Sequence, residues 1–404
     1  MLIANTKGGE RVNLFEKHNL LTLKEFRKQN VFFCPECSEE VVLKIGSKRI
    51  PHFSHKKGSE CPESYERESE YHINGKLLLY SWLKEKGLDP VLEPYYSDIS
   101  QRPDIGVNYE GEDYAIEYQC SVISEALFIK RSEAYIQSGI IPIWILAGKN
   151  LRRIGKNKIS LSGFQYLFLH KTALGNWVIP FFCPITKSFI NTHQIVPFTV
   201  RNSFSNFDII PLSHASLKIL FDPPHLPGNL SHYEWQREIR QTKNFLSQTR
   251  GSFHNKFLQE LYSHSLIPSL LPPEIGLPVF HAPYIETSPI QWQGYLFMDV
   301  LLKDDVFSFE KMISCFQKRV WKSDIKIRKL PLVHSGEAVY AVKEYIELLV
   351  NLKVLERAGK GLYRKRAPFS ASENQTSLLQ WEEDFYREKG IIIVDSTKQS
   401  IFVK

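Results

Sequence analysis

Two runs of alternating apolar and polar residues flank a short turn in the first third of the chain. The apolar positions are Ile105, Val107 and Tyr109 in the first run and Tyr114, Ile116 and Tyr118 in the second. A period of two is typical of half-buried β-strands, and a glycine lies in the segment between them. The pattern therefore predicts a β-hairpin over residues 105–119.

Polar side chains occupy the remaining positions of this hairpin. Glu117 and Gln119 share the face of the second strand opposite Tyr118, and Asp104 stands at the start of the first strand. We expect Asp104, Glu117 and Gln119 to converge. Two carboxylates suit Mg²⁺ or Mn²⁺, and a metal held there can activate water for phosphodiester cleavage.

A solvated turn is the alternative interpretation of these charges. Asp104 follows a proline and can serve as a turn residue. Glu117 argues against this alternative, because residues 114–120 contain no basic residue. A carboxylate buried in such a strand needs a partner from elsewhere.

A helix is predicted before the hairpin, since apolar residues between 78 and 83 recur at helical spacing. A second row with a spacing of four holds Glu68, His72 and Lys76. We expect Glu68 and Lys76 to form solvated ion pairs. Glu70 and His72 are expected to point towards Asp104.

A second helix is predicted over residues 122–138, with Lys130, Arg131 and Tyr135 exposed to a partner. Lys130 and Arg131 are candidate nucleic-acid contacts. The near-continuous apolar run at residues 140–147 is typical of a strand inside a parallel sheet. Helix, three strands, helix and strand follow one another, so we expect residues 62–150 to form one α/β domain.

Five candidate metal ligands precede this domain, namely Cys34, Cys37, His52, His55 and Cys61. A Cys-Pro-x-Cys turn after aromatic residues is a common zinc knuckle. Cys34, Cys37, His55 and Cys61 would make a Cys₃His site, and His52 in place of Cys61 would make a Cys₂His₂ site. Surface histidines with buried thiols are the alternative. Because no open coordination position is evident, we expect structural zinc in a β module over residues 1–61.

Residues 151–404 are expected to form a mixed α+β region. An amphipathic helix followed by a hairpin predicts a winged-helix-like part at residues 335–366. Its hairpin can present Lys360, Arg364, Lys365 and Arg366 to a nucleic-acid backbone, although a solvated hairpin explains these charges too. A second basic run, beside one aromatic residue, offers Lys318, Arg319, Lys322, Lys326, Arg328 and Lys329.

Composition adds limits to this picture. With 404 residues, 43% hydrophobic and 24% charged, the chain is long enough for two or three domains. The net charge of +7 permits a polyanionic partner. No apolar run approaches a bilayer span, and the first residues lack the apolar core of a secretory signal, so we expect a cytoplasmic protein without a membrane span.

Several motifs together resemble one known family, the competence protein CoiA family. They are Cys-Pro-Glu-Cys (34–37), His-Phe-Ser-His (52–55), Glu-Ser-Glu-Tyr-His (68–72), Arg-Pro-Asp (102–104) and Glu-Tyr-Gln-Cys-Ser (117–121), with further similarity at residues 271–279 and 289–293. Each motif alone is common, whereas the set is specific. The resemblance implies a middle domain similar to the PD-(D/E)xK nuclease fold, which is the fold of restriction endonucleases. It also implies a role in natural transformation.

The resemblance assigns roles to the hairpin residues. Asp104 takes the position of the motif's aspartate, Glu117 that of the second acid, and Gln119 that of the lysine. An amide cannot stabilise charge as an ammonium does, although it can orient water; Lys76 or Lys130 can supply the missing cation.

Two functions follow from the resemblance. One is a Mg²⁺- or Mn²⁺-dependent DNA endonuclease or processing factor that promotes recombination of incoming DNA. The other is a catalytically inactive mediator that binds single-stranded or branched DNA and assists a RecA-type recombinase. A related nuclease acting on RNA or in defence is a further alternative.

Overall fold

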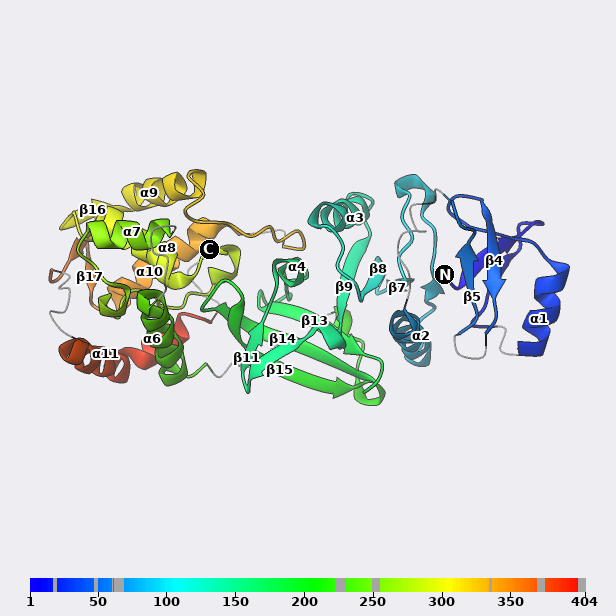
Figure 1. Ribbon diagram of the computed structural model, residues 1–404. Helices are drawn as coiled ribbons and strands as arrows, with labels where there is room; N and C mark the ends of the chain where they lie inside the picture. The colour runs from blue at the N-terminus through cyan, green and yellow to red at the C-terminus, as the bar shows by residue number, and fades with distance from the viewer. Residues whose placement is uncertain are drawn as a thin grey trace. The chain divides into compact units, whose positions relative to one another are not determined.

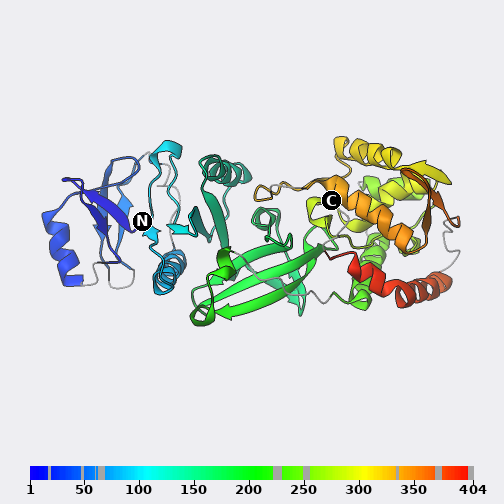
Figure 2. The same ribbon diagram turned by 180° about the vertical axis from the view of Figure 1, so that it is seen from behind.

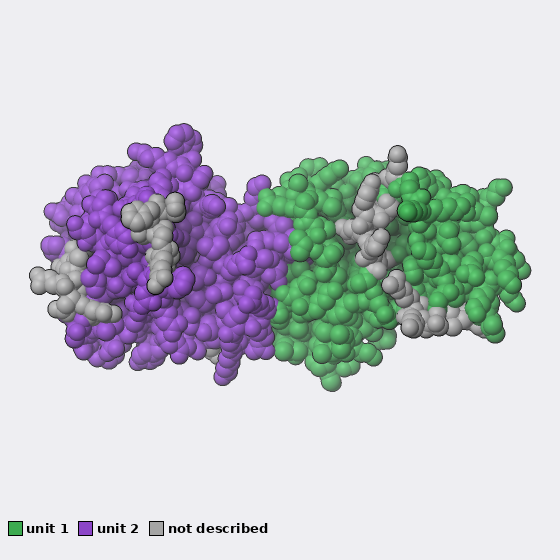
Figure 3. Space-filling view, in the orientation of Figure 1, with its two compact units in different colours: residues 1–151, 179–191, 208–224 green, residues 152–178, 192–207, 225–404 purple. Residues whose placement is uncertain are grey.

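The computed structural model describes residues 1–16, 20–46, 50–59, 61, 69–221, 230–248, 255–333, 336–368 and 375–398. These residues form two compact units, coloured separately in Figure 3. Unit 1 comprises residues 1–151, 179–191 and 208–224, and unit 2 comprises residues 152–178, 192–207 and 225–404. The overall class is mixed α/β and multidomain, as the sequence predicts.

Unit 1 begins with a small antiparallel β module. Its elements are β1 (Ile3–Thr6), β2 (Arg11–Asn13), α1 (Leu20–Gln29), β3 (Phe32–Phe33), β4 (Glu40–Lys44) and β5 (His52–His55). The strands pair in the order β2-β1-β3-β4-β5. Figure 1 labels β4, β5 and α1 of this module. Alternate residues of β4 are buried, as expected of a strand with one face on a core.

The α/β part of unit 1 contains the predicted order of helix, three strands, helix and strand. These elements are α2 (Glu70–Glu85), β6 (Val91–Leu92), β7 (Ile105–Tyr109), β8 (Glu112–Gln119), α3 (Glu125–Gln137) and β9 (Ile141–Ala147). β7 and β8 form the predicted antiparallel hairpin, in which Ile105 pairs with Ile116. Glu110 and Gly111 adopt positive φ at its turn, a backbone that favours glycine. β9 lies parallel to β8, as its apolar run predicts.

The two helices lie on opposite sides of the β7–β8–β9 strands, in Figure 1 and from behind in Figure 2. β9 also pairs in parallel with β13 (Trp177–Cys183) through Phe181 and Phe182. The sheet of unit 1 therefore includes strand residues beyond the expected limit at residue 150. The helix α5 (Lys218–Phe221) closes this unit.

Two expectations about the helices are wrong. Lys76 is only 1% exposed rather than solvated, because two carboxylates from other elements surround it. In α3 the buried positions are Phe128, Ser132 and Tyr135, so the helix is rotated relative to the predicted phase and Tyr135 is not exposed. Glu68 lies outside the described residues.

Unit 2 combines strands with a helical region. Its first elements are β10 (Arg152–Gly155), β11 (Lys158–Ser160), α4 (Gly163–Tyr166) and β12 (His170–Lys171). β13, β14 (Ser188–Pro197) and β15 (Asn202–Pro211) each contribute residues to both units. The helical region contains α6 (His232–Gln248), α7 (Lys256–Ser263), α8 (Pro289–Leu296), α9 (Phe309–Trp321), α10 (Ala338–Asn351) and α11 (Gln375–Asp395). Among the described residues, no helix is long and apolar enough to cross a membrane.

The predicted helix and hairpin near the C-terminal end are present as α10, β17 (Leu355–Gly359) and β18 (Leu362–Lys365). A third strand, β16 (Val306–Ser308), pairs with β18, which gives the sheet order β16-β18-β17. Along the chain the elements of this region follow in the order α8, β16, α9, α10, β17 and β18. That they form a winged-helix-like module stays a prediction. Half of the residues of α10 are buried, so one face of this helix packs against the protein interior.

Candidate functional site

Asp104 lies directly before β7, where hydrogen-bond donors from α2 and β8 surround its carboxylate. Its Oδ2 is 3.0 Å from His72 Nε2 and accepts the backbone N–H of Tyr118 at 2.9 Å. Its Oδ1 is 3.2 Å from Lys76 Nζ. The side chain is 13% exposed, so these partners compensate a largely desolvated charge.

Lys76 joins Asp104 to a second carboxylate that the sequence did not single out. Its Nζ is 2.6 Å from Glu93 Oε1, and both side chains are almost fully buried. Glu93 also accepts the backbone N–H groups of Leu2 and Ile3, at 2.9 to 3.2 Å, from the N-terminal end of the chain. Lys76 is therefore shared between the Asp104 position and a carboxylate that anchors the β module.

Glu93 could have been found by the argument applied to Glu117. It directly follows the short apolar strand β6 and has no basic neighbour in the sequence, so its burial requires a distant partner. Its backbone φ is +47°, a conformation that costs a non-glycine residue about 1 kcal/mol or more. Three donors to its carboxylate compensate that cost.

Glu117 has its partners on the other helix. Arg131 Nη2 lies 2.5 Å from its Oε1, and the Tyr135 hydroxyl donates to the same oxygen at 2.6 Å. Glu117 is 4% exposed, and burial raises the pKa of Tyr135 well above its usual value, an effect that the negative charge of Glu117 increases. The required partner of the buried carboxylate is thus Arg131, which the sequence had placed at the surface.

Neighbouring positions on β8 therefore face different helices. Tyr118 stacks on Tyr71 of α2 at 6.4 Å, whereas Glu117 contacts α3. Asp104 receives its side-chain donors from α2. The convergence of Asp104, Glu117 and Gln119 on a divalent cation stays a prediction.

The other predicted residues of this site differ in their surroundings. The Gln119 amide donates to the Ser121 carbonyl at 2.9 Å. His72 contacts Asp104 as expected, while Glu70 is exposed in the first turn of α2. Lys130 is exposed on α3.

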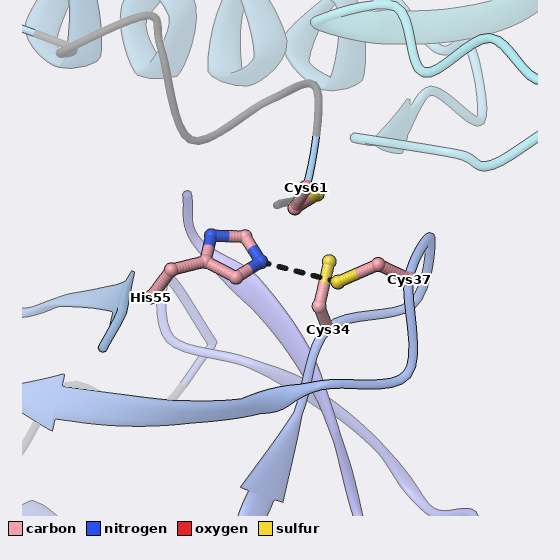
Figure 4. Close-up of side chains that lie close together, drawn as sticks. All are labelled: Cys34, Cys37, His55 and Cys61. Atoms are coloured by element: carbon pink, nitrogen blue, oxygen red, sulfur yellow. Dashed lines mark hydrogen bonds between the residues drawn. The ribbon is translucent and has the colours of Figure 1, made fainter. Parts of the chain in front are cut away.

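The second site lies in the β module, where Cys34, Cys37, His55 and Cys61 come together (Figure 4). Their ligand atoms lie within 4.8 Å of one another, and Cys37 Sγ is 3.4 Å from His55 Nε2. A tetrahedral zinc with Zn–S bonds of about 2.3 Å would hold its ligands roughly 3.7 Å apart. The cluster can hold a metal ion, and three thiols with one imidazole are the donor set of a Cys₃His site.

The strand β5 explains why His55 and not His52 belongs to this cluster. His55 shares the face of β5 that carries the buried Phe53, because side chains alternate along a strand. His52 Nδ1 instead lies 2.9 Å from the carbonyl oxygen of Ile50. The Cys-Pro-Glu-Cys turn aims the backbone N–H of Glu36 at Cys34 Sγ, as a zinc knuckle does.

The basic run of unit 2 divides into structural and exposed cations. Arg328 is buried and donates to the carbonyls of Pro283, Ile285 and Val200, and Arg319 is held by acidic side chains. The exposed members are Lys318, Lys322, Lys326 and Lys329.

The cations of the C-terminal hairpin pair with acidic groups. Arg364 and Arg366 lie 3.5 and 3.7 Å from Glu356, and Lys365 lies 3.1 Å from Asp305. Lys360 is exposed at the turn. Contact of any of these residues with nucleic acid stays a prediction.

Three family models match the chain along most of its length. They are the N-terminal domain of competence protein CoiA at residues 15–64, its nuclease-like domain at residues 68–225, and its C-terminal domain at residues 230–379. The nuclease-like match contains Asp104, Glu117 and Lys76, and it suggests interaction with nucleic acid. The N-terminal match contains all of the cluster of Figure 4.

A curated relative gives the same result. The competence protein CoiA of Bacillus subtilis (strain 168) is 30% identical over 366 residues, which cover 89% of this chain and 96% of that protein. No solved structure matched the chain. Three consecutive domain matches and a relative of nearly equal extent lead to one conclusion: the chain belongs to the competence protein CoiA family.

Proposed function

We propose that this protein is a metal-dependent DNA nuclease that processes incoming DNA for recombination during natural transformation. The observation that carries the proposal is the Asp104 carboxylate, held by His72 and Lys76 at the start of β7 within a nuclease-like domain. A buried carboxylate with a lysine and a histidine in reach is typical of sites with perturbed acid–base chemistry.

In this proposal Asp104 and Glu117 bind Mg²⁺ or Mn²⁺ through carboxylate oxygens, the ligand type that these ions prefer. When bound, the ion supplies an activated water and neutralises charge on the phosphate. The arrangement of Figure 1, with α2 and α3 on either side of β8, assigns one carboxylate to each helix. Binding a shared ion therefore requires Glu117 to exchange Arg131 for the metal.

Lys76 supplies the cation that Gln119 lacks. Its ammonium is 3.2 Å from Asp104 Oδ1, so it can stabilise negative charge that develops beside that carboxylate. Gln119 orients water, and His72 exchanges a proton at Nε2, the atom that faces Asp104. Glu70, which is exposed in the first turn of α2, would contact the DNA substrate.

We assign structural zinc to the cluster of Cys34, Cys37, His55 and Cys61. The three cysteines would bind the metal as thiolates, after losing their protons, and this ligation would couple the fold of the β module to metal binding. The module is tied to the Asp104 position through Glu93 and Lys76. We further propose, from the expectation drawn from the sequence, that the protein acts in the cytoplasm.

A catalytically inactive DNA-binding mediator, which assists a RecA-type recombinase on single-stranded or branched DNA, is the second candidate. The specific observation in its favour is the Arg131 and Tyr135 pair on Glu117 Oε1. A carboxylate neutralised in this way is a poor metal ligand until Arg131 moves away.

Incubation with linear, branched and single-stranded DNA in Mg²⁺, Mn²⁺ or EDTA tests the two candidates. Metal-dependent cleavage that disappears in Asp104→Asn and Lys76→Met, but persists in Lys130→Met, supports the nuclease. Binding of the same DNA without cleavage in every metal supports the mediator.

A further inference from the structure

Trp321 at the C-terminal end of α9 is the most exposed large apolar side chain that the structure describes. It is 83% exposed, while Met312 and Phe316 bury the other face of the helix. Trp side chains are usually largely buried, and one that projects beside cations is typical of a binding surface. Lys318 and Lys322 are exposed on either side of it.

The neighbouring residue Arg319 fixes this end of α9. Its guanidinium contacts Asp299 at 2.8 Å, Glu260 at 2.7 Å and Asp324 at 3.0 Å. It also lies 4.3 Å from the centre of the Tyr295 ring. Three carboxylates therefore hold this end of α9 through Arg319, and Trp321 is the last residue of that helix.

A hollow of about 650 Å³ opens beside this helix end. Its walls include Lys256, Gln291, Thr287, Lys322 and Lys326. Hollows of roughly 300 to 1,000 Å³ accommodate small ligands, and this one has space for a nucleotide.

The charges of the hollow favour an anionic ligand. Asp324 is neutralised by Arg319 and by Lys256, whose Nζ is 2.5 Å from its Oδ1. Lys322 and Lys326 are exposed, and Glu286 contributes one carboxylate on the same wall. Once Asp324 is paired with Lys256 and Arg319, two exposed lysines, Lys322 and Lys326, stand against one carboxylate, Glu286, among these wall residues.

We propose that this surface binds a single strand of DNA, with one base stacked on Trp321 and adjoining phosphates held by Lys322 and Lys326. The choice of DNA rests on the proposed function, whereas stacking and charge rest on the surface itself. Stacking on an exposed aromatic ring needs an unpaired base, because both faces of a paired base are covered in a duplex. A protein partner that docks on the same tryptophan is the competing occupant.

Fluorescence anisotropy with a labelled thymidine 20-mer and the full chain tests this proposal. EDTA is included so that no cleavage at the Asp104 site contributes. Trp321→Ala should weaken binding by roughly 5- to 150-fold, as expected for the loss of one stacked base, and Trp321→Phe should retain most of the affinity. Removing both lysines, Lys322→Gln with Lys326→Gln, should reduce the salt dependence of log K by about 1.4.

A control variant distinguishes loss of the Trp321 surface from the general effect of removing an exposed aromatic side chain. Phe245→Ala removes another exposed aromatic residue, 70% exposed on α6, and should bind as wild type. The nuclease proposal is tested separately by its cleavage assay, so its failure is recognised independently of this binding measurement. The proposal for this surface would be overturned if Trp321→Ala bound the 20-mer as tightly as wild type does. It would also be overturned if Trp321→Ala lost as much affinity for duplex DNA as for the single strand. Either result would favour a protein partner.

Discussion

The ammonium of Lys76 lies 2.6 Å from the carboxylate of Glu93, in a pair that is almost completely excluded from solvent. The same nitrogen lies 3.2 Å from Asp104, so one buried cation is shared by two carboxylates. Removing one member of a buried ion pair leaves an uncompensated charge, which is far more costly than breaking a surface pair.

Lys76→Met is therefore expected to destabilise the protein by about 3–5 kcal/mol, because it leaves Glu93 and Asp104 buried without the cation that they share. Urea unfolding measures the change. Lys86→Met, at an exposed position just after the same helix, should change the free energy of unfolding by less than about 0.5 kcal/mol. Equal stability of the two variants would contradict the pairing.

Glu93→Gln tests the link between the β module and the α/β part. The Glu93 carboxylate accepts the N–H groups of Leu2 and Ile3, and hydrogen bonds to a charged acceptor contribute about 1.5–3 kcal/mol. Amide exchange at Leu2 and Ile3 should accelerate by roughly 10- to 150-fold in the variant. Glu85→Gln, at an exposed position of α2, serves as the control, and unchanged exchange in Glu93→Gln would refute the link.

Local patterns predicted the elements around this pair but not the pair itself. The β7–β8 hairpin follows from alternation and from the glycine of its turn, both of which involve residues close in sequence. Lys76 could not be placed, because an isolated lysine in a helical row is usually solvated. Its burial depends on Glu93 and Asp104, which reach it only after the chain has folded back.

The phase of α3 shows the same limit. Ala126 is exposed and Tyr135 is buried, since the helix is oriented by the contact of Arg131 and Tyr135 with Glu117 rather than by its aliphatic residues. The metal cluster was more predictable, because its ligands are few, close in sequence and chemically specific. Strand alternation, applied to Phe53, would also have selected His55 over His52.

The two histidines of β5 give a matched test of the metal cluster. His55→Ala removes a proposed zinc ligand. Losing a residue that only hydrogen-bonds to a ligand typically weakens metal binding roughly tenfold to hundredfold, so the loss of His55 should weaken zinc binding by more than that. His52→Ala should retain zinc, because His52 contacts the Ile50 carbonyl instead. Zinc released to a chromogenic chelator measures both variants. Retention of zinc by His55→Ala together with its loss from His52→Ala would reverse the ligand assignment.

Glu274 is expected to make the stability of unit 2 depend on pH. Burial raises its pKa to about 7, and its Oε2 has no hydrogen-bond partner among the described residues. Because the folded state then binds a proton more tightly than the unfolded state, stability from this group is present below the unfolded pKa of 4.5 and is lost as pH rises towards 7. The loss is on the order of 1–3 kcal/mol.

Glu274→Gln should abolish that part of the pH dependence, since a glutamine does not titrate. Urea unfolding of wild type and variant at pH 5 and pH 7.5 measures the difference. Burial lowers the pKa of Lys243, which interacts electrostatically with Glu274, to about 8, so this lysine begins to titrate at the upper end of the window in both proteins. Parallel pH profiles of the two proteins would show that Glu274 is ionised throughout.

In the proposed nuclease site, Arg131 would decide whether Glu117 can bind a metal. Its guanidinium is 2.5 Å from Glu117 Oε1 and 5.5 Å from the centre of the Trp144 ring, so it neutralises the carboxylate from a packed position. Arg131→Met should destabilise the metal-free protein by about 3–5 kcal/mol, because Glu117 is left buried without its guanidinium partner. The same change should strengthen divalent-cation binding, since a competing cation is removed.

Removing Arg131 should therefore lower the melting temperature of the metal-free protein and increase the stabilisation that a divalent cation provides, and one experiment measures both effects. Thermal unfolding without and with millimolar Mn²⁺ should show a lower melting temperature for Arg131→Met in EDTA and a larger rise on adding Mn²⁺ than in wild type. Arg131→Lys retains a cation and should respond to Mn²⁺ as wild type does, while Glu117→Gln should lose most of the response. If Mn²⁺ raises the melting temperatures of wild type, Arg131→Met and Glu117→Gln equally, Glu117 is not a ligand, and its ion pair with Arg131 serves to fix α3 on the sheet.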